Sequence, residues 1–399
     1  MHKLEFELKQ HTPIIHFQAT DDGATLRASE VKPKLDRFLL RAYEKKIPQS
    51  TIKNGTEKGH HPSLDFKIKF IPHNTKRISA DRTPMYFGNL KSKKPKQLIF
   101  SDNGVRMIIL VKDETLKKLI EENMARFFLL HNFGSRQSKG YGSFTIKDEK
   151  ISNIRSLYKY SFDIKTTDYN NVLKSINYFY KSLRSGINEY RSSKDKKLVS
   201  LLYFKSAFHY YATTHKGKQW DKRSIKQHFF PEQLKKEEQI HKINDINRDD
   251  EKYDFRDLLG LSTNETWKQF NISKTCRGKD GKEINRLKSP IQFKPIFIGD
   301  KCVVFFDVFT EDTGFEEFLG SKVFVNAFKK EKGEDSLKEP SKPIKEPLEM
   351  IVPRDIKLND ILDYIFSNID VEKRIAPIKT EEGKKIFEDI KRIYTSLKK

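Results

Sequence analysis

The stretch from Leu116 to Ile146 constrains the fold most, because it joins an amphipathic helix, a glycine-rich basic loop and a short strand. Apolar residues recur there at intervals of three and four, which predicts a helix with one buried face. These residues are Leu116, Leu119, Ile120, Met124, Phe127 and Phe128. The order of helix, loop and strand argues against a dinucleotide-binding fingerprint, because that motif requires strand, loop and helix.

The loop between this helix and the strand, residues 133–144, carries Gly134, Gly140 and Gly142 together with Arg136 and Lys139. Glycine adopts positive φ and lets the backbone approach a partner closely. Successive backbone N–H groups in such a loop can form an anion-binding concavity, to which the two cations add full charges. The loop therefore predicts a phosphate backbone as its ligand. The alternative is a plain helix-to-strand connection whose charges are solvated.

The charge balance of the whole chain points to the same class of partner. The 399 residues include 78 Lys and Arg against 55 Asp and Glu, which gives a net charge of +23 and a pI near 9.6. Such an excess favours a polyanionic partner, above all nucleic acid. Part of the charge can also serve solubility alone.

The first half of the chain predicts an α+β fold of the ferredoxin-like (βαββαβ, RRM-like) type. Strands are expected at residues 4–8, 64–70 and 143–146, and a helix at residues 29–42 precedes the second of them. Residues 98–100 and 105–111 flank Ser101-Asp102-Asn103-Gly104 and predict a hairpin. The aromatic strand signature of an RNA-recognition motif is missing, so base stacking on this sheet is not expected.

The second half predicts a second domain of the same type with a helical insertion. Expected elements are a strand at 160–164, helices at 172–183 and 198–211, an exposed charged insertion at 216–254, a hairpin at 291–309 and two closing helices. The predicted domains are residues 1–150, residues 151–328, a flexible linker at 329–354 rich in Lys, Glu and Pro, and C-terminal helices at 355–399.

Cysteine usage and the absence of long apolar runs predict a cytoplasmic protein. Cys276 and Cys302 are the only cysteines and lack metal-binding spacing, which argues against a disulfide framework and a zinc site. The N-terminal sequence has no apolar run of a signal peptide, and no stretch reaches the length of a membrane span. No cofactor is expected.

Three segments resemble the RAMP superfamily of CRISPR-associated RNA-binding proteins, and most closely the first-numbered subunit of the Cmr-type (type III-B) effector complex. They are residues 26–42, where a basic stretch leads into an arginine-rich helix, the glycine-rich loop 133–144, and the Ser-Pro start of a strand at 286–293. The resemblance is strongest over roughly the first 150 residues.

The resemblance implies two ferredoxin-like domains in a subunit at one end of a filament assembled along CRISPR RNA. Such a subunit contacts the 3′ region of the guide RNA or the target RNA in antiviral defence, next to other effector subunits and away from membranes. The expected RNA-binding residues are Arg27, Lys32, Lys34, Arg37, Arg41, Gly134, Ser135, Arg136, Gln137, Lys139, Gly140 and Gly142. The alternatives are a solvated helix face and a loop that docks a neighbouring subunit.

Catalytic residues are not expected. Asp21 and Asp22 could hold Mg²⁺, but with Gly23 they fit a turn better. His11 and His16 could act as acid and base, as in guide-processing endoribonucleases of this superfamily. Those enzymes carry the glycine-rich loop near the C-terminus, whereas here it closes the first domain. Two alternatives stay open, a metal-independent endoribonuclease that processes guide RNA and a basic scaffold that binds only proteins.

Overall fold

The structure, a computed structural model, describes residues 1–16, 25–53, 62–79, 97–192, 198–235, 251–267, 270–311, 313–329 and 342–398. It is a mixed α+β fold, as the sequence predicts. The described residues form two compact units. The first contains the described parts of Met1–Met85, Lys91–Ile176 and Gln292–Asp307, and the second those of Asn177–Ile291 and Val308–Lys399. Among the described residues, no helix is long and apolar enough to cross a membrane.

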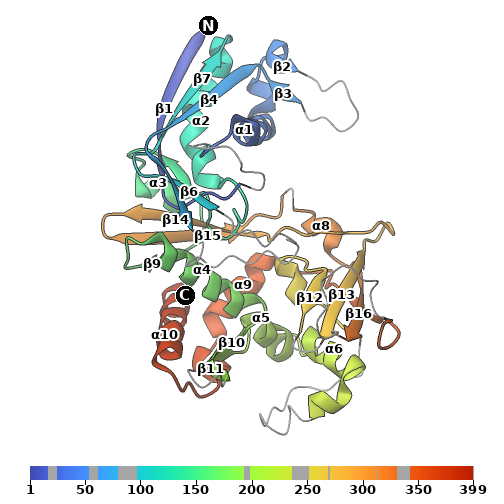
Figure 1. Cartoon of the computed structure of the whole chain (residues 1–399). Coiled ribbons are helices and arrows are strands. Elements are labelled where there is room, and N and C mark those ends of the chain that lie inside the picture. Colours follow the sequence, from blue (N-terminus) through green and yellow to red (C-terminus); the bar gives the residue numbers. More distant parts are fainter. Residues whose placement is uncertain are drawn as a thin grey trace. The chain divides into compact units, whose positions relative to one another are not determined.

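The first unit is built on a four-stranded antiparallel sheet and two helices (Figure 1). In chain order, these elements are β1 (His2–Gln10), α1 (Ala28–Tyr43), β4 (Phe66–Pro72), β7 (Val105–Val111), α2 (Glu114–Leu130) and β8 (Phe144–Ile146). The strand order is β4-β7-β1-β8, with β1 antiparallel to both β7 and β8 and β7 antiparallel to β4. The expected sequence of strand, helix, two strands, helix and strand is therefore present.

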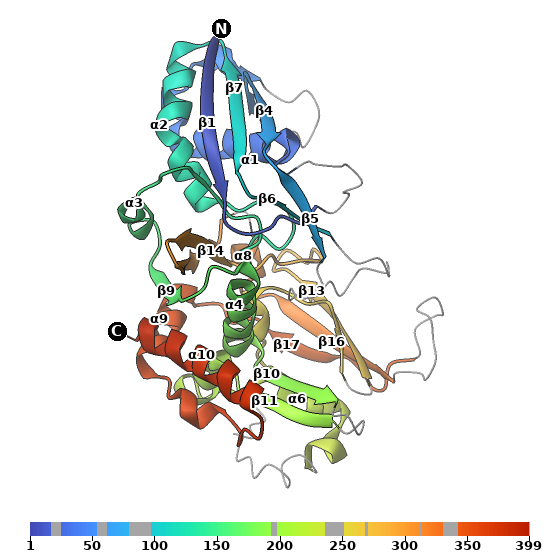
Figure 2. The same ribbon diagram turned by 60° about the vertical axis from the view of Figure 1, so that its left-hand side comes forward.

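One face of this sheet packs against α1 and α2, which lie beside the strands in Figure 2. Alternate residues of the strands are buried, among them Leu4, Leu8, Met107 and Ile109, because successive side chains of a strand point to opposite faces. The other face carries charged residues, and there Glu5 pairs with both Lys3 and Arg106. The sheet thus has a core side and a solvent side of mixed charge.

The prediction that the strands on either side of residues 101–104 pair as a hairpin is wrong. The turn itself forms, because Gly104 N–H donates to the Ser101 carbonyl (3.2 Å). However, β6 (Gln97–Ser101) pairs with β5 (Thr75–Ser79), whereas β7 joins the main sheet. Ile14 also pairs with β6: its N–H donates to the Ile99 carbonyl (2.9 Å), and its carbonyl accepts from the Ile99 N–H (3.0 Å).

Two further predictions for the first unit, a strand and a hairpin, are confirmed. The strand predicted at 160–164 is β9 (Tyr160–Ile164), which pairs with β15 (Lys301–Val308) next to β14 (Ile291–Ile298). The second predicted hairpin, β14 and β15, is confirmed. The smaller elements are β2 (Ile52–Lys53), β3 (Ser63–Leu64), α3 (Ile151–Arg155) and 3-10 turns at Glu44–Lys46 and Gln49–Thr51.

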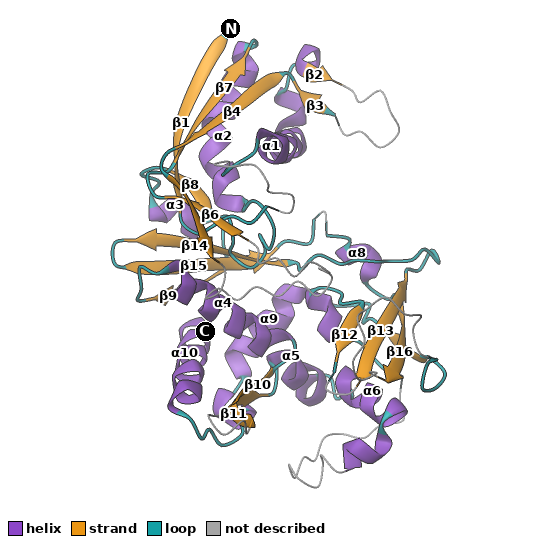
Figure 3. Cartoon of the chain, viewed as in Figure 1, coloured by secondary structure: helices purple, strands orange, loops and turns teal. Residues whose placement is uncertain are grey.

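The second unit combines a four-stranded antiparallel sheet with helices (Figure 3). The sheet order is β12 (Asn264–Thr266), β13 (Phe270–Arg277), β16 (Lys322–Lys329) and β17 (Leu348–Ile351). The helices are α4 (Tyr169–Arg184, which begins in the first unit), α5 (Ala207–Tyr210), α6 (Asp221–Phe229), α8 (Phe315–Phe318), α9 (Leu358–Asn368) and α10 (Glu381–Leu397). A π turn at Tyr211–His215 and 3-10 turns at Arg256–Leu259 and Val371–Arg374 complete it. The helices predicted at 172–183 and at the C-terminus are confirmed.

The helix predicted at 198–211 is wrong over most of its length. Leu198–Phe204 is strand β11, which pairs with β10 (Ile187–Ser192), and only α5 and the following π turn are helical. Leu201, Leu202 and Phe204 are buried in this pairing. A short apolar run fits either a strand or a helix, and here the neighbouring strand decided the outcome.

Two other predicted segments differ in part from the structure. In the insertion predicted at 216–254 to be exposed, α6 buries Ile225 and Phe229, and residues 236–250 lie outside the described residues. In the linker predicted at 329–354, Leu348–Ile351 forms strand β17, and residues 330–341 also lie outside the described residues. The domain boundary at residue 150 stays a prediction. The first compact unit extends to Ile176 and includes Gln292–Asp307.

Candidate functional site

The glycine-rich loop has the backbone conformation that its sequence predicts. Gly134, Gly140 and Gly142 have φ of +80°, +85° and +64°. The requirement is strictest at Gly142, where an added Cβ would lie 1.9 Å from the Phe133 carbonyl oxygen. Arg136 also adopts a positive φ of 57°. A side chain at Gly142 would therefore force the loop to open.

Several backbone N–H groups of the loop, however, donate to acceptors inside the protein. Their acceptors are Glu30 Oε1 for Gly134 (2.5 Å), the Ile15 carbonyl for Ser135 (2.8 Å), the Arg136 carbonyl for Lys139 (2.8 Å), the Gln137 carbonyl for Gly140 (3.3 Å), the Pro13 carbonyl for Gly142 (2.9 Å) and Thr12 Oγ1 for Ser143 (3.0 Å). These six groups do not line an anion-binding concavity, in contrast to the expectation from the sequence.

Helix α1 holds one side of the loop. Lys34 Nζ donates to the Asn132 carbonyl (3.0 Å) and to Gln137 Oε1 (2.8 Å), and it pairs with Glu30 (3.4 Å). The Lys34 ammonium also lies 4.8 Å from the centre of the Phe133 ring. Only 16% of the Lys34 side chain is exposed. Lys34 therefore fastens the loop to the helix, and its charge is already matched within the protein.

Strand β14 holds the other side of the loop. Phe293 N–H donates to the Ser138 carbonyl (3.2 Å), and Asn132 Nδ2 donates to the Phe293 carbonyl (2.7 Å). Ser143 Oγ donates to the Pro295 carbonyl (2.8 Å). The loop is thus fixed from two sides by backbone and side-chain hydrogen bonds, which makes it a rigid surface feature.

The structure brings some of the expected cations together. Lys34, Arg37 and Arg41 follow one another along a single face of α1 at three- and four-residue spacing, which leads away from the loop. We call Arg37 and Arg41 the α1 arginines. Arg41 is exposed and Arg37 is half-buried, like Arg27 at the start of the helix. In the loop, Lys139 is half-buried, and the Arg136 guanidinium lies 5.6 Å from the centre of the Tyr141 ring.

Lys32 lies elsewhere. Its ammonium donates to Asp36 Oδ2 (2.7 Å) and to the Leu64 carbonyl (3.0 Å), and it sits 4.4 Å from the centre of the Phe66 ring. Burial raises the pKa of Asp36, while the hydrogen bond from Lys32 acts in the opposite direction. Lys32 thus neutralises a buried carboxylate, and this geometry favours a structural role.

A lysine that the sequence analysis missed secures the end of α2. Lys294 on β14 is fully buried, and its Nζ donates to the carbonyls of Phe128 (2.7 Å), His131 (2.9 Å) and Phe144 (2.8 Å). Burial holds the pKa of Lys294 well below its ordinary value, and the positive charge of Lys34 adds to this. The three carbonyls act in the opposite direction, because they match the three donors of an ammonium group. A single lysine within the apolar run 291–298 was the available signal.

The two histidines considered as acid and base are buried in the fold. Phe297 N–H donates to His11 Nδ1 (3.0 Å), so the ring proton is on Nε2, which donates to Thr145 Oγ1 (2.9 Å). Burial holds the pKa of His11 well below its ordinary value. His16 Nε2 donates to the Thr25 carbonyl (2.5 Å). Asp21, Asp22 and the His60-His61 pair lie outside the described residues.

The cysteines show no reactive environment. Cys276 and Cys302 are both free and buried. Burial raises the pKa of the Cys276 thiol to about 11 and that of Cys302 to about 12, so neither is a ready thiolate. Among the residues that the structure describes, no group of three or more His, Cys, Asp or Glu side chains is arranged to hold a metal ion.

Comparisons with known proteins identify the family. The sequence matches the Cmr1 N-terminal domain over residues 1–187 and the Cmr1 C-terminal domain over residues 203–392. A comparison with curated protein sequences found no match. Together, the two domain matches cover more than nine-tenths of the chain.

Solved structures give weaker similarities. The crystal structure of Cmr1 from Pyrococcus furiosus in its apo form matches over 88% of this chain and 94% of that chain, with 14% identity and a TM-score of 0.31. A cryo-EM structure of the type III-B Cmr-beta bound to cognate target RNA matches over 37% of this chain, with 18% identity and a TM-score of 0.26. There the match spans 58% of the other chain. The two domain matches confirm the resemblance found in the sequence, and the chain belongs to the Cmr1 family of type III-B CRISPR proteins.

Proposed function

We propose that this protein is a non-catalytic RNA-binding subunit of a type III CRISPR effector complex in the cytoplasm. It would contact the 3′ region of the guide RNA, the target RNA, or both, next to other subunits of the complex. Family membership supports the complex as its setting. The observation that carries the RNA-binding part is the position of the α1 arginines beside a loop that is fixed on two sides.

RNA backbones are bound chiefly through their phosphates, for which arginine supplies a planar pair of donors. The α1 arginines are one and two helical turns beyond Lys34, the residue that fastens the loop. We infer that the RNA follows this side of α1 past the loop. In this view Gly134, Gly140 and Gly142 shape the loop, whereas Arg27, Arg136 and Lys139 offer side-chain contacts to phosphates.

The burial of His11 and His16 supports a non-catalytic role. A general base must come within hydrogen-bond reach of the proton that it removes. Both ring nitrogens of His11 are occupied by Thr145 and Phe297, and His16 donates to a backbone carbonyl. The alternative of a guide-processing endoribonuclease would require both rings to leave these contacts.

The sheet order β4-β7-β1-β8 and the two helices on one face support a ferredoxin-like fold for the first unit. A second ferredoxin-like domain stays a prediction.

The test is the binding of single-stranded RNA to the full chain over a salt series. The variant is Arg37→Ala/Arg41→Ala, because alanine preserves the helix. The matched control is Lys118→Ala/Arg126→Ala, which removes two exposed cations from α2 in the same unit. Each lost phosphate contact should flatten the plot of log K against log salt by roughly 0.7. We expect weaker binding and a flatter plot only for the α1 variant.

Equal effects of both variants would mean that the α1 arginines contribute only nonspecific positive charge, which would contradict the proposed site. Metal-free cutting of a repeat-derived RNA hairpin by the wild type, abolished by His11→Gln in a folded variant, would instead establish the endoribonuclease. Loss of binding to a neighbouring subunit with unchanged RNA binding would assign α1 and the loop to subunit docking.

A further inference from the structure

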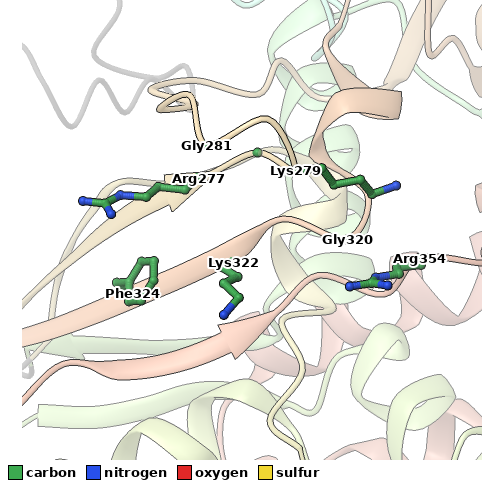
Figure 4. Close-up of a pocket in the computed structure, with 8 residues that line it drawn as sticks. Arg277, Lys279, Gly281, Gly320, Lys322, Phe324 and Arg354 are labelled. Atoms are coloured by element: carbon green, nitrogen blue, oxygen red, sulfur yellow. The ribbon is translucent and has the colours of Figure 1, made fainter.

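The second unit contains a cationic pocket that the sequence analysis did not single out. It has a volume of about 520 Å³ and lies at one end of the sheet β12-β13-β16-β17 (Figure 4). Its lining residues are Arg277, Gly278, Lys279, Gly281, Gly320, Lys322, Phe324 and Arg354. Four of these eight residues are cations and none is acidic. We call this set the cationic pocket.

Strand alternation places three of the lining residues on the open face of this sheet. On β13 and β16 every second residue is buried, so Arg277, Lys322 and Phe324 point to the other side. Arg277 and Lys322 are direct partners across the two antiparallel strands. Like charges in opposite positions destabilise a sheet, so the fold tolerates a repulsion at this point.

The strand that carries Arg277 is fixed from its buried side. Lys274, on the opposite face of β13, is fully buried and donates to Asp254 (2.9 Å) and Asp257 (2.5 Å). Arg184 in turn bonds Asp257 (2.7 Å). This buried network sets β13 in place without using the cations of the open face.

Gly320 lets the other two cations approach each other. A Cβ at this position would lie 2.8 Å from Lys279 Cε and 2.8 Å from Arg354 Cγ, so both side chains pass over the same glycine. Figure 4 shows them on either side of it. Within the described part of the chain, neither Lys279 nor Arg354 makes an ion pair. Lys322 pairs with the exposed Glu349 (2.7 Å), an interaction of small energy.

An aromatic ring accompanies the charges. Phe324 is half-buried, and the Arg277 guanidinium lies 5.6 Å from the centre of its ring. Phe328, also half-buried, faces the same side of β16 about 13 Å further along, at roughly 3.3 Å per residue. Cations beside partly exposed aromatic rings are a combination by which proteins hold single-stranded nucleic acid.

We propose that the cationic pocket binds a segment of single-stranded RNA, with phosphates against Arg277, Lys279, Lys322 and Arg354 and one base stacked on Phe324. The proposal rests on the proposed function for the class of ligand, and it adds a second RNA site, in the second unit. A nucleotide fits a pocket of this size. The second aromatic residue on this face of β16, Phe328, favours a strand over a single nucleotide.

The experiment measures the binding of a short, fluorescently labelled single-stranded RNA to the full chain over a salt series. The variants are Lys279→Ala/Arg354→Ala and Phe324→Leu, since leucine keeps an apolar side chain but removes the ring. The matched control is Lys282→Ala/Lys373→Ala, which removes two exposed cations of the same unit outside the pocket. Phe324→Tyr should restore binding because the ring can still stack.

We expect Phe324→Leu to weaken RNA binding roughly tenfold with an unchanged salt slope, as for the loss of one stacked base. Lys279→Ala/Arg354→Ala should flatten the salt plot by about 1.4, the sum of two phosphate contacts, and the control should change it less. RNA containing 4-thiouridine should cross-link to the segment of β16 that includes Phe324.

Three outcomes would overturn the proposal. The first is an effect of the control equal to that of the pocket variant. The second is no loss with Phe324→Leu in a chain that still unfolds at the wild-type temperature. The third is binding of inorganic phosphate or a nucleoside triphosphate to the pocket without any binding of RNA there. If the pocket variants bind normally while Arg37→Ala/Arg41→Ala is impaired, the pocket proposal fails and the proposed function stands. If only the pocket variants are impaired, the α1 site fails and the pocket stands.

Discussion

The glycine-rich loop and the cationic pocket both combine glycines with cations, but they use them in opposite ways. In the loop, six backbone N–H groups and the Lys34 ammonium have acceptors within the protein. In the pocket, two like charges face each other across paired strands, and Lys279 and Arg354 converge over Gly320. The polar groups of the loop stabilise the loop itself, whereas the pocket keeps positive charge at the surface.

The two sheets show the same difference. On the open face of the first sheet, Glu5 and Glu7 pair with Lys3 and Arg106, so the charges cancel locally. On the open face of the second sheet, Arg277, Lys322 and Phe324 gather around one cavity. A sequence motif rich in glycine and basic residues therefore does not by itself identify a ligand site, because the contacts of each donor decide what remains for a ligand.

Glycine replacement should show the largest difference between the two regions. Gly142→Ala places a Cβ 1.9 Å from the Phe133 carbonyl oxygen at a φ of +64°, so we expect a loss of unfolding free energy above about 4 kcal/mol. Gly281→Ala, at a φ of +79° with no atom within 4 Å, should cost only about 1 kcal/mol. Urea unfolding of both variants is the measurement. Equal losses would show that the loop yields as easily as an open turn.

Replacement of the buried Lys294 should have the next largest effect. Lys294→Met leaves three buried carbonyls without their donor, and we expect a loss of about 3–5 kcal/mol in urea unfolding. Because the folded pKa of Lys294 is lowered, the unfolded chain binds more protons between this pKa and about 10.4. The unfolding free energy of the wild type should therefore increase relative to that of the variant as pH rises in this window. A constant gap would mean that the carbonyls keep the ammonium charged.

Acid should lower the stability of the first unit through His11, which bonds Thr145 and Phe297. Burial lowers the pKa of His11 in the folded chain. Below pH about 6.5 the unfolded chain therefore binds a proton that the folded chain does not bind. Stability should fall by up to about 2 kcal/mol between pH 7 and pH 5. His11→Gln, which can both donate to Thr145 and accept from Phe297, should remove most of this decline. Thermal unfolding at the two pH values decides, and an equal decline in the variant would assign the acid effect to other groups.

The smallest effect on RNA binding should come from Lys32→Ala. Its ammonium already neutralises Asp36, so we expect unchanged affinity for RNA within about twofold and a stability loss of about 1–2 kcal/mol. The same RNA titration and urea unfolding as above provide the measurement. A loss of affinity as large as that of Arg37→Ala/Arg41→Ala would return Lys32 to the RNA-binding set.

Patterns that repeat within one element were predictable from the sequence. The spacing of Leu116 to Phe128 predicts α2, and the alternation of Leu4, Phe6 and Leu8 predicts β1, because each pattern follows from the geometry of a single helix or strand. The positive φ of Gly134, Gly140 and Gly142 was likewise predictable. The family resemblance came from the glycine-rich loop, together with residues 26–42 and 286–293. Pairing between strands was less accessible, as β6 and β11 show, since it depends on which distant segment offers hydrogen bonds.

The sequence alone thus determined the α+β class, the amphipathic helices, the loop with its three glycines and the Cmr1 family. The tertiary structure alone decided which partner each charged side chain has. It fastens Lys34 to the loop, buries Lys294 under α2, and sets Arg277 opposite Lys322. The reason is physical: the sequence gives the sign of a charge, but its partners come from residues up to 166 positions away. Whether a cation binds a ligand depends on whether the fold has already matched it.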